Sequence, residues 1–112
     1  MTTHEVPPEL AKWMEDRAEL LVKAAHRIKK NSDTRVGQPA GEWLLELLRD
    51  LAAVETISMR GIHLLTTYAL RTGSATQTEV ARASDVTTTA ASNRGASRIA
   101  RETWNEVWPE KR

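Results

Sequence analysis

The chain has 112 residues, 40% of them hydrophobic and 28% charged, and a net charge of +1. Its length is that of one domain, 1–112, and its composition excludes a disordered or collagen-like chain. No run of 18 apolar residues exists to span a membrane, so we expect no membrane partner. The absence of cysteine excludes disulfides and thiolate metal sites. We expect a cytoplasmic protein, because MTTHEVPPEL lacks the pattern of a secretory signal peptide.

The first predicted element is a long amphipathic helix over residues 6–30. Pro7 and Pro8 suit a helix start, and apolar residues then recur every three or four positions from Leu10 to Ile28. We expect this helix to contribute to a homodimer. The next segment, 31-NSDTRVGQPAG-41, combines turn-forming residues with glycine and proline and predicts a loop.

A basic cluster covers the end of this helix and the loop. Such a cluster is usually a solvated helix end, where cations also suit the helix dipole. The alternative interpretation is a secondary contact to phosphate. Its members are Lys23, Arg27, Lys29, Lys30 and Arg35.

Residues 42–73 are apolar around most of the helical wheel, which predicts central helices that are buried on several sides. We place one helix at about 42–53 and another at about 56–71, although 52-AAVETISM-59 could also continue unbroken. Gly73 is expected to close the second helix in a left-handed conformation.

Residues 76–108 predict two further helices. The segment 76-TQTE-79 has the form of a capping box and begins a short helix. Turn-forming residues follow at 84-SDVT-87, and Thr87 can cap a last helix that runs on to Trp108, before Pro109. The fold class is therefore all-α, with about five helices and no β-hairpin wing at the C-terminal end.

The segment from Thr76 to Ala96 resembles a helix-turn-helix DNA-binding motif of the kind found in small bacterial and phage transcriptional regulators. Two steeply crossing helices need a small residue at their closest approach and apolar residues at the corner. Ala81 fits the first requirement. Ser84 and Asp85 stand where the motif usually has leucine and glycine, and aspartate tolerates a left-handed turn. Val80, Val86 and Ala91 fit the corner.

This resemblance implies that the helix from Thr87 enters the major groove of double-stranded DNA and reads base edges with its first two turns. No acid occurs from Val86 to Arg101, so no carboxylate would repel the backbone. We expect the start of the preceding helix to lie near phosphate. The candidate DNA-binding residues are Thr76, Gln77, Thr78, Thr87, Thr88, Thr89, Ser92, Asn93, Arg94 and Arg98.

Rows of Thr, Ser, Ala and Arg also form ordinary solvated helix faces. The alternative function is therefore a helical protein–protein interaction module, similar to an adaptor or an antitoxin, that does not bind DNA. The four tryptophans, Trp13, Trp43, Trp104 and Trp108, form either the core of the monomer or a dimer surface.

The sequence carries no pattern typical of an enzyme. There is no glycine-rich phosphate loop, no GxSxG and no cysteine nucleophile, and the acids are scattered on exposed helical positions. His4, His26 and His63 share neither a helical face nor a metal-ligand spacing. We therefore expect no catalytic activity, no metal and no cofactor, and no residue specifies a small effector.

Overall fold

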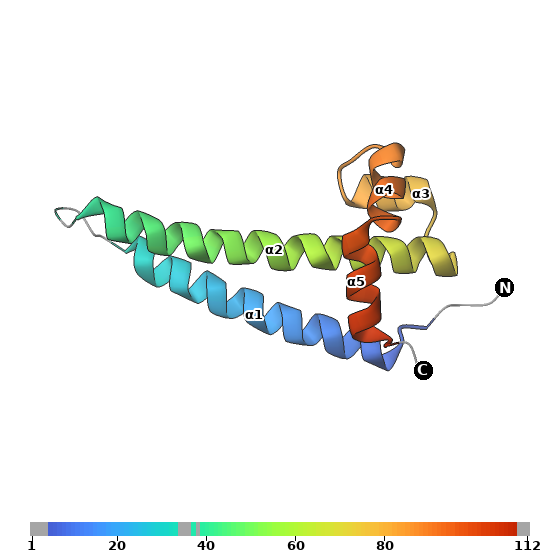
Figure 1. Ribbon diagram of the computed structural model, residues 1–112, viewed down its shortest axis with the longest axis horizontal. Coiled ribbons are helices and arrows are strands. Elements are labelled where there is room, and N and C mark those ends of the chain that lie inside the picture. The colour runs from blue at the N-terminus through green and yellow to red at the C-terminus, as the bar shows by residue number, and fades with distance from the viewer. Residues whose placement is uncertain (1–4, 34–36, 38, 110–112) are drawn as a thin grey trace.

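The computed structural model describes residues 5–33, 37 and 39–109, and this part of the chain is all-helical, as predicted. The helices are α1 Pro8–Ser32, α2 Ala40–Thr72, α3 Gln77–Ala83, α4 Thr88–Gly95 and α5 Arg98–Val107. Within the described ranges there is no strand, and no helix is long and apolar enough to cross a membrane. Helices α1 and α2 form a long antiparallel hairpin, and the three short helices gather near the C-terminal part of α2 (Figure 1).

Helix α1 begins at Pro8, which occupies the first helical position, where a missing N–H costs no hydrogen bond. Its apolar stripe faces α2, and Leu10, Trp13 and Ala24 are buried. At the far end of the hairpin, the indole N–H of Trp43 donates to the carbonyl oxygen of Asn31. This bond ties the start of α2 to the last turn of α1.

Helix α2 is one continuous helix, so the predicted break between residues 53 and 56 is wrong. Buried or half-buried residues recur every three or four positions along α2 without a change of phase across the expected break. A break would interrupt this face and would leave unpaired peptide groups at two new helix ends. The helix ends at Gly73, whose φ of 71° is left-handed, as predicted. The residues of this face are Trp43, Leu47, Asp50, Val54, Ile57, Gly61, Leu64 and Tyr68.

Two glycines in helices should respond differently to substitution by alanine. A Cβ built on Gly61 meets no atom within 4 Å, so Gly61→Ala should stabilise the protein by about 0.5–1 kcal/mol through helix propensity. A Cβ on Gly95 would lie 3.1 Å from Cδ1 of Leu70 and 3.6 Å from Cγ2 of Thr66, where α4 packs on α2. Gly95→Ala should therefore gain less than Gly61→Ala or destabilise the fold. Thermal unfolding of both variants measures this difference, and equal gains would contradict the close packing.

The prediction of one last helix from Thr87 to Trp108 is also wrong, because this segment divides into α4 and α5. Ala96 and Ser97 leave the helical conformation, with ψ angles of 4° and 161°. The Ser97 hydroxyl accepts from the amide of Ala100 at 3.1 Å and donates to the carbonyl of Arg94 at 2.7 Å. Ser97 thus caps α5 and binds the end of α4, a role that the sequence analysis missed. The break lets α5 turn and cross α2 towards α1 (Figure 1).

The main core lies where α1, α2 and α5 meet. Leu10 and Trp13 pack with Leu64 and Val107, which come from the other two helices. Trp104 and Trp108 are partly buried against this cluster, and both stack on Tyr68, with ring centroids 6.1 and 5.7 Å apart. In this structure these tryptophans therefore pack within one chain, which is the first of the two alternatives that the sequence left open.

A charged junction fixes α5 against the hairpin. Glu106 accepts from the indole N–H of Trp13 at 3.2 Å and pairs with Arg60 at 2.7 Å and with Arg17 at 3.6 Å. These partners lie on α1 and α2, so one carboxylate joins three helices. These contacts therefore hold the C-terminal part of α5 on the α1–α2 hairpin.

Candidate nucleic-acid interface

Helix α3 begins with the predicted capping box. The Thr76 hydroxyl accepts from the amide of Glu79 at 3.1 Å, and the Glu79 carboxylate accepts from the amide of Thr76 at 2.9 Å. Two amides that have no partner within the helix are thereby satisfied. The Thr76 side chain is thus engaged in holding the helix start.

The capping box predicts a pH dependence in the stability of α3. The backbone N–H of Thr76 is the main cause that lowers the pKa of Glu79 below its ordinary value of 4.5, and the Thr76 side chain and Arg82 act in the same direction. A lowered folded-state pKa adds stability above pH 4.5 that is lost as the pH falls through the folded-state value. The difference in Tm between the wild type and Glu79→Ala should therefore be constant near neutrality and shrink below pH 4.5. A difference that does not change from pH 7 to pH 3 would contradict this role.

The turn after α3 is closed by two backbone hydrogen bonds. The amide of Val86 donates to the carbonyl of Ala81 at 2.9 Å, and the amide of Asp85 donates to that of Arg82 at 3.2 Å. Asp85 itself is left-handed, with a φ of 55°. This arrangement is a Schellman ending, in which the residue after the cap is usually glycine. Asp85 adopts the conformation that the sequence analysis assigned to it.

Small and apolar side chains fill the corner between α3 and α4. Val80, Ala81 and Ala91 are buried together, and Val86 packs against them. The same cluster reaches α2 through Ala69 and Leu70. The corner residues chosen from the sequence therefore lie in one cluster that seats the α3–turn–α4 pair on α2.

Helix α4 exposes a short polar face. The hydroxyl of Thr87 caps the helix by accepting from the amide of Ala90 at 3.1 Å, as predicted. Of the residues that follow, Ala91 is buried and a set of polar side chains on the first two turns is exposed. These are Thr88, Thr89, Ser92 and Asn93, which we call the α4 face. No carboxylate belongs to it.

The residues at the start of α3 lie beside this face but differ in what their side chains do. Gln77 donates from Nε2 to the carbonyl of Thr88 at 2.8 Å and so links the first turns of α3 and α4. Thr78 is exposed. Of the three candidates on this segment, two are therefore engaged in intramolecular hydrogen bonds.

The two candidate arginines do not lie together on the α4 face. Arg94 is half-buried, and its Nη1 is buried without a hydrogen-bond partner. Arg98 belongs to α5, beyond the break that the sequence analysis missed, and its side chain is 84% exposed. Its Nε lies 2.8 Å from a carboxylate oxygen of Glu102.

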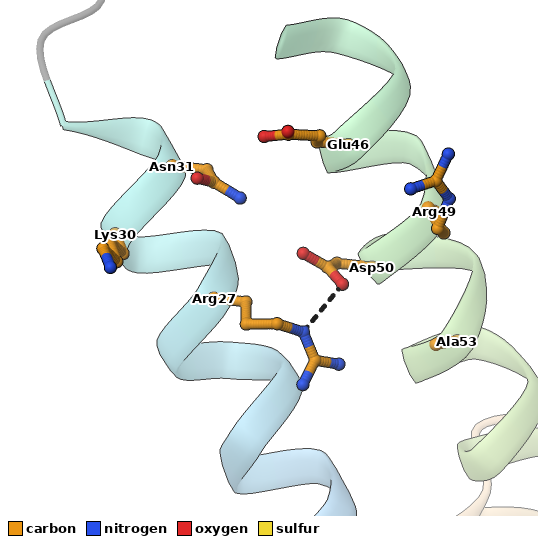
Figure 2. Close-up of a pocket in the computed structure, with 7 residues that line it drawn as sticks. All are labelled: Arg27, Lys30, Asn31, Glu46, Arg49, Asp50 and Ala53. Carbon is orange, nitrogen blue, oxygen red and sulfur yellow. Dashed lines mark hydrogen bonds and ion pairs between the residues drawn. The ribbon is translucent and has the colours of Figure 1, made fainter. Parts of the chain in front are cut away.

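The basic cluster near the hairpin tip is mixed in charge. Figure 2 shows Arg27 reaching across from α1 to Asp50 of α2, with Nε 2.9 Å from the carboxylate, and Glu46 one turn away on α2. These groups line an open cavity of about 730 Å³. It lies roughly 30 Å from the α4 contact on α2, at 1.5 Å per helical residue. Arg35, like His4, lies outside the described residues.

Neither histidine in the described residues marks a metal site. His63 has its Nδ1 2.8 Å from the carbonyl oxygen of Met59, and His26 is exposed on α1. Across 5–33, 37 and 39–109, no three His, Asp or Glu side chains gather closely enough to hold a metal ion.

No protein-family model, no curated protein and no solved structure matches this chain. The resemblance to a helix-turn-helix motif therefore rests on the residues and geometry of the α3–turn–α4 pair alone.

Proposed function

We propose that the protein binds double-stranded DNA in a sequence-specific manner and acts as a small dimeric transcriptional regulator. The observation that supports this proposal best is the α4 face: four exposed polar side chains without a carboxylate, on a helix held by a buried corner. In this proposal the N-terminal turns of α4 enter the major groove. Occupancy of the site by the protein then blocks or recruits polymerase.

The side chains of the α4 face suit base readout. The amide of Asn93 can donate to and accept from the edge of an adenine, and the methyl groups of Thr88 and Thr89 can contact the methyl group of thymine. The hydroxyl of Ser92 can pair with either kind of base edge. Among the described residues, none of these four exposed side chains takes part in a hydrogen bond, so all four can reach a duplex without first breaking one.

The neighbouring groups suit phosphate contacts. Thr78 is exposed at the start of α3, and Arg98 extends from the start of α5. Transfer of Arg98 from Glu102 to a phosphate costs little, because an exposed ion pair contributes about 0–1 kcal/mol. Arg94 would act from its half-buried position at the end of α4, as a contact at the edge of the face.

The competing function is a helical interaction module that does not bind DNA. Exposed leucines along α2 favour a protein partner, and this holds for either of the two functions. The two functions make different demands on the α4 face. Only DNA binding requires it to be free of acids and open to a duplex.

A salt titration tests the proposal. Binding to a fluorescent duplex of mixed sequence should weaken steeply as salt rises, with a linear relation between the logarithms of the binding constant and the salt concentration, because released counterions drive association. The variant Thr89→Asp, which places a carboxylate on the α4 face, should bind more weakly than Thr56→Asp, which places one on an exposed position of α2. Absence of binding even at low salt would refute the proposal.

A further inference from the structure

Helix α2 carries a second apolar stripe that no described part of the chain covers. We call it the α2 stripe and define it by Leu44, Leu48, Leu51, Met59, Ile62 and Leu65. Each of these side chains is at least 38% exposed, and Leu48 is 60% exposed. Most of them follow the alternating steps of three and four residues that characterise a helix–helix seam, interrupted by Glu55 and Ser58.

The α2 stripe lies on a different side of α2 from the hairpin contact. At 100° per residue, it is displaced by roughly 120° from the face that packs on α1. One helix is therefore apolar on two separate faces, and α1 covers only one of them. Such a helix is expected at the interior of a larger bundle.

The area and shape of the chain agree with a missing neighbour. The chain exposes 8340 Å², whereas a compact folded protein of its mass exposes about 6,200 Å². Its radius of gyration is 17.5 Å, against about 13 Å for a compact chain of this length. The excess area is well over 1,000 Å², which exceeds the share of about 800 Å² that each partner buries in a standard interface.

We propose that the α2 stripe is the interface with a second copy of this chain, packed antiparallel. The direction follows from an asymmetry of the stripe. Its C-terminal end is flanked by α3, and Ile62 and Leu65 line an apolar groove of about 390 Å³ together with Val80 and Ala83 of α3. A parallel copy would bring two α3 helices to the same level of the seam. In an antiparallel copy, the N-terminal end of the α2 stripe, at Leu44, lies in this groove instead.

The antiparallel arrangement also sets the spacing of the two α4 helices, an argument that rests on the proposed DNA binding. The centre of the stripe lies between residues 54 and 55, and α4 packs on α2 around Thr67. At 1.5 Å per residue, the two contact points lie roughly 40 Å apart along the seam. This distance is close to the 34–36 Å between half-sites separated by one turn of DNA. The sequence analysis placed the dimer contact on the first helix, whereas this proposal places it on α2.

Oligomeric state is the first test. By sedimentation and light scattering, the wild type should be a dimer, and the variant Leu48→Asp with Leu51→Asp should be a monomer with unchanged helical content. Val22→Asp is the matched control, because Val22 is 54% exposed and its position on α1 points away from α2. A wild type that stays monomeric at 0.1 mM, or a control that dissociates equally, would overturn the proposal.

Cross-linking tests the direction, and the chain has no cysteine of its own to interfere. Under oxidation, a mixture of Leu44→Cys and Leu65→Cys should form the mixed disulfide dimer, and neither variant alone should form one efficiently. Efficient dimers of each variant alone would overturn the antiparallel arrangement.

The monomeric double variant, Leu48→Asp with Leu51→Asp, separates this inference from DNA binding. It should keep salt-dependent binding to a single half-site and lose the gain in affinity from an inverted repeat. Loss of binding to the half-site as well, with the fold intact, would count against the proposed function and not against the dimer.

Discussion

Asn93→Ala is expected to weaken binding to the preferred DNA site by about 1–3 kcal/mol, which corresponds to a loss of roughly 5- to 150-fold. The reason is that Asn93 is exposed on the second turn of α4, where its amide can both donate to and accept from one base edge. Binding to unrelated sequences should change little, because phosphate contacts dominate non-specific affinity. Fluorescence anisotropy with the preferred site and with a scrambled site measures both.

Asn105→Ala is the matched control for this variant. Asn105 is also an exposed asparagine on a helix, but it lies on α5 near Trp104 and Trp108 and not on the α4 face. Its removal should leave both affinities unchanged. If Asn93→Ala and Asn105→Ala behave alike, or if Asn93→Ala weakens all sequences equally, Asn93 does not read a base.

The second large effect concerns stability. Leu64→Ala should lower the free energy of unfolding by about 2–5 kcal/mol, because Leu64 is fully buried where α1, α2 and α5 meet and its removal leaves a cavity. This loss should be the same at every protein concentration, since the contacts lie within one chain. Urea denaturation of the variant and the wild type at two concentrations measures it. A loss below 1 kcal/mol would contradict this account of the core.

Leu48→Ala provides the comparison on the same helix. Leu48 is exposed in the single chain, so its truncation costs little within the monomer. In the proposed dimer, however, it should reduce stability at high protein concentration and lose this effect on dilution. A cost of Leu48→Ala that is independent of concentration would place Leu48 in a contact within the chain.

Features specified by a few neighbouring residues could be predicted from the sequence. The capping box at Thr76, the cap at Thr87 and the left-handed ends at Gly73 and Asp85 are all present. Each depends on side-chain and backbone groups within one turn, so residue types and spacing suffice. The corner at Ala81 followed from the same kind of pattern, because a small residue between apolar ones marks a close approach.

Features that depend on distant packing could not be predicted in this way. The continuity of α2 follows from a face that packs on α1 and α5, whereas the sequence near Thr56 left both a break and a continuous helix open. Helix α4 ends just before Ser97, which caps α5. The sequence pattern did not reveal this end, because Gly95 and Ala96 also fit the spacing of one continuous helix. Because of this break, Arg98 belongs to α5 and not to α4, and Arg94 is half-buried and not fully exposed. Ser97 followed by a run of helix formers was the one local signal available.

The most direct measurement of the proposed function is selection of bound sequences from a random pool of duplex DNA. A dimer that places one α4 helix in each half-site should enrich an inverted repeat whose half-sites lie about one helical turn apart, and Asn93→Ala should lose that enrichment. A pool that shows no enrichment after repeated rounds, from a protein whose helical fold is intact, would contradict it.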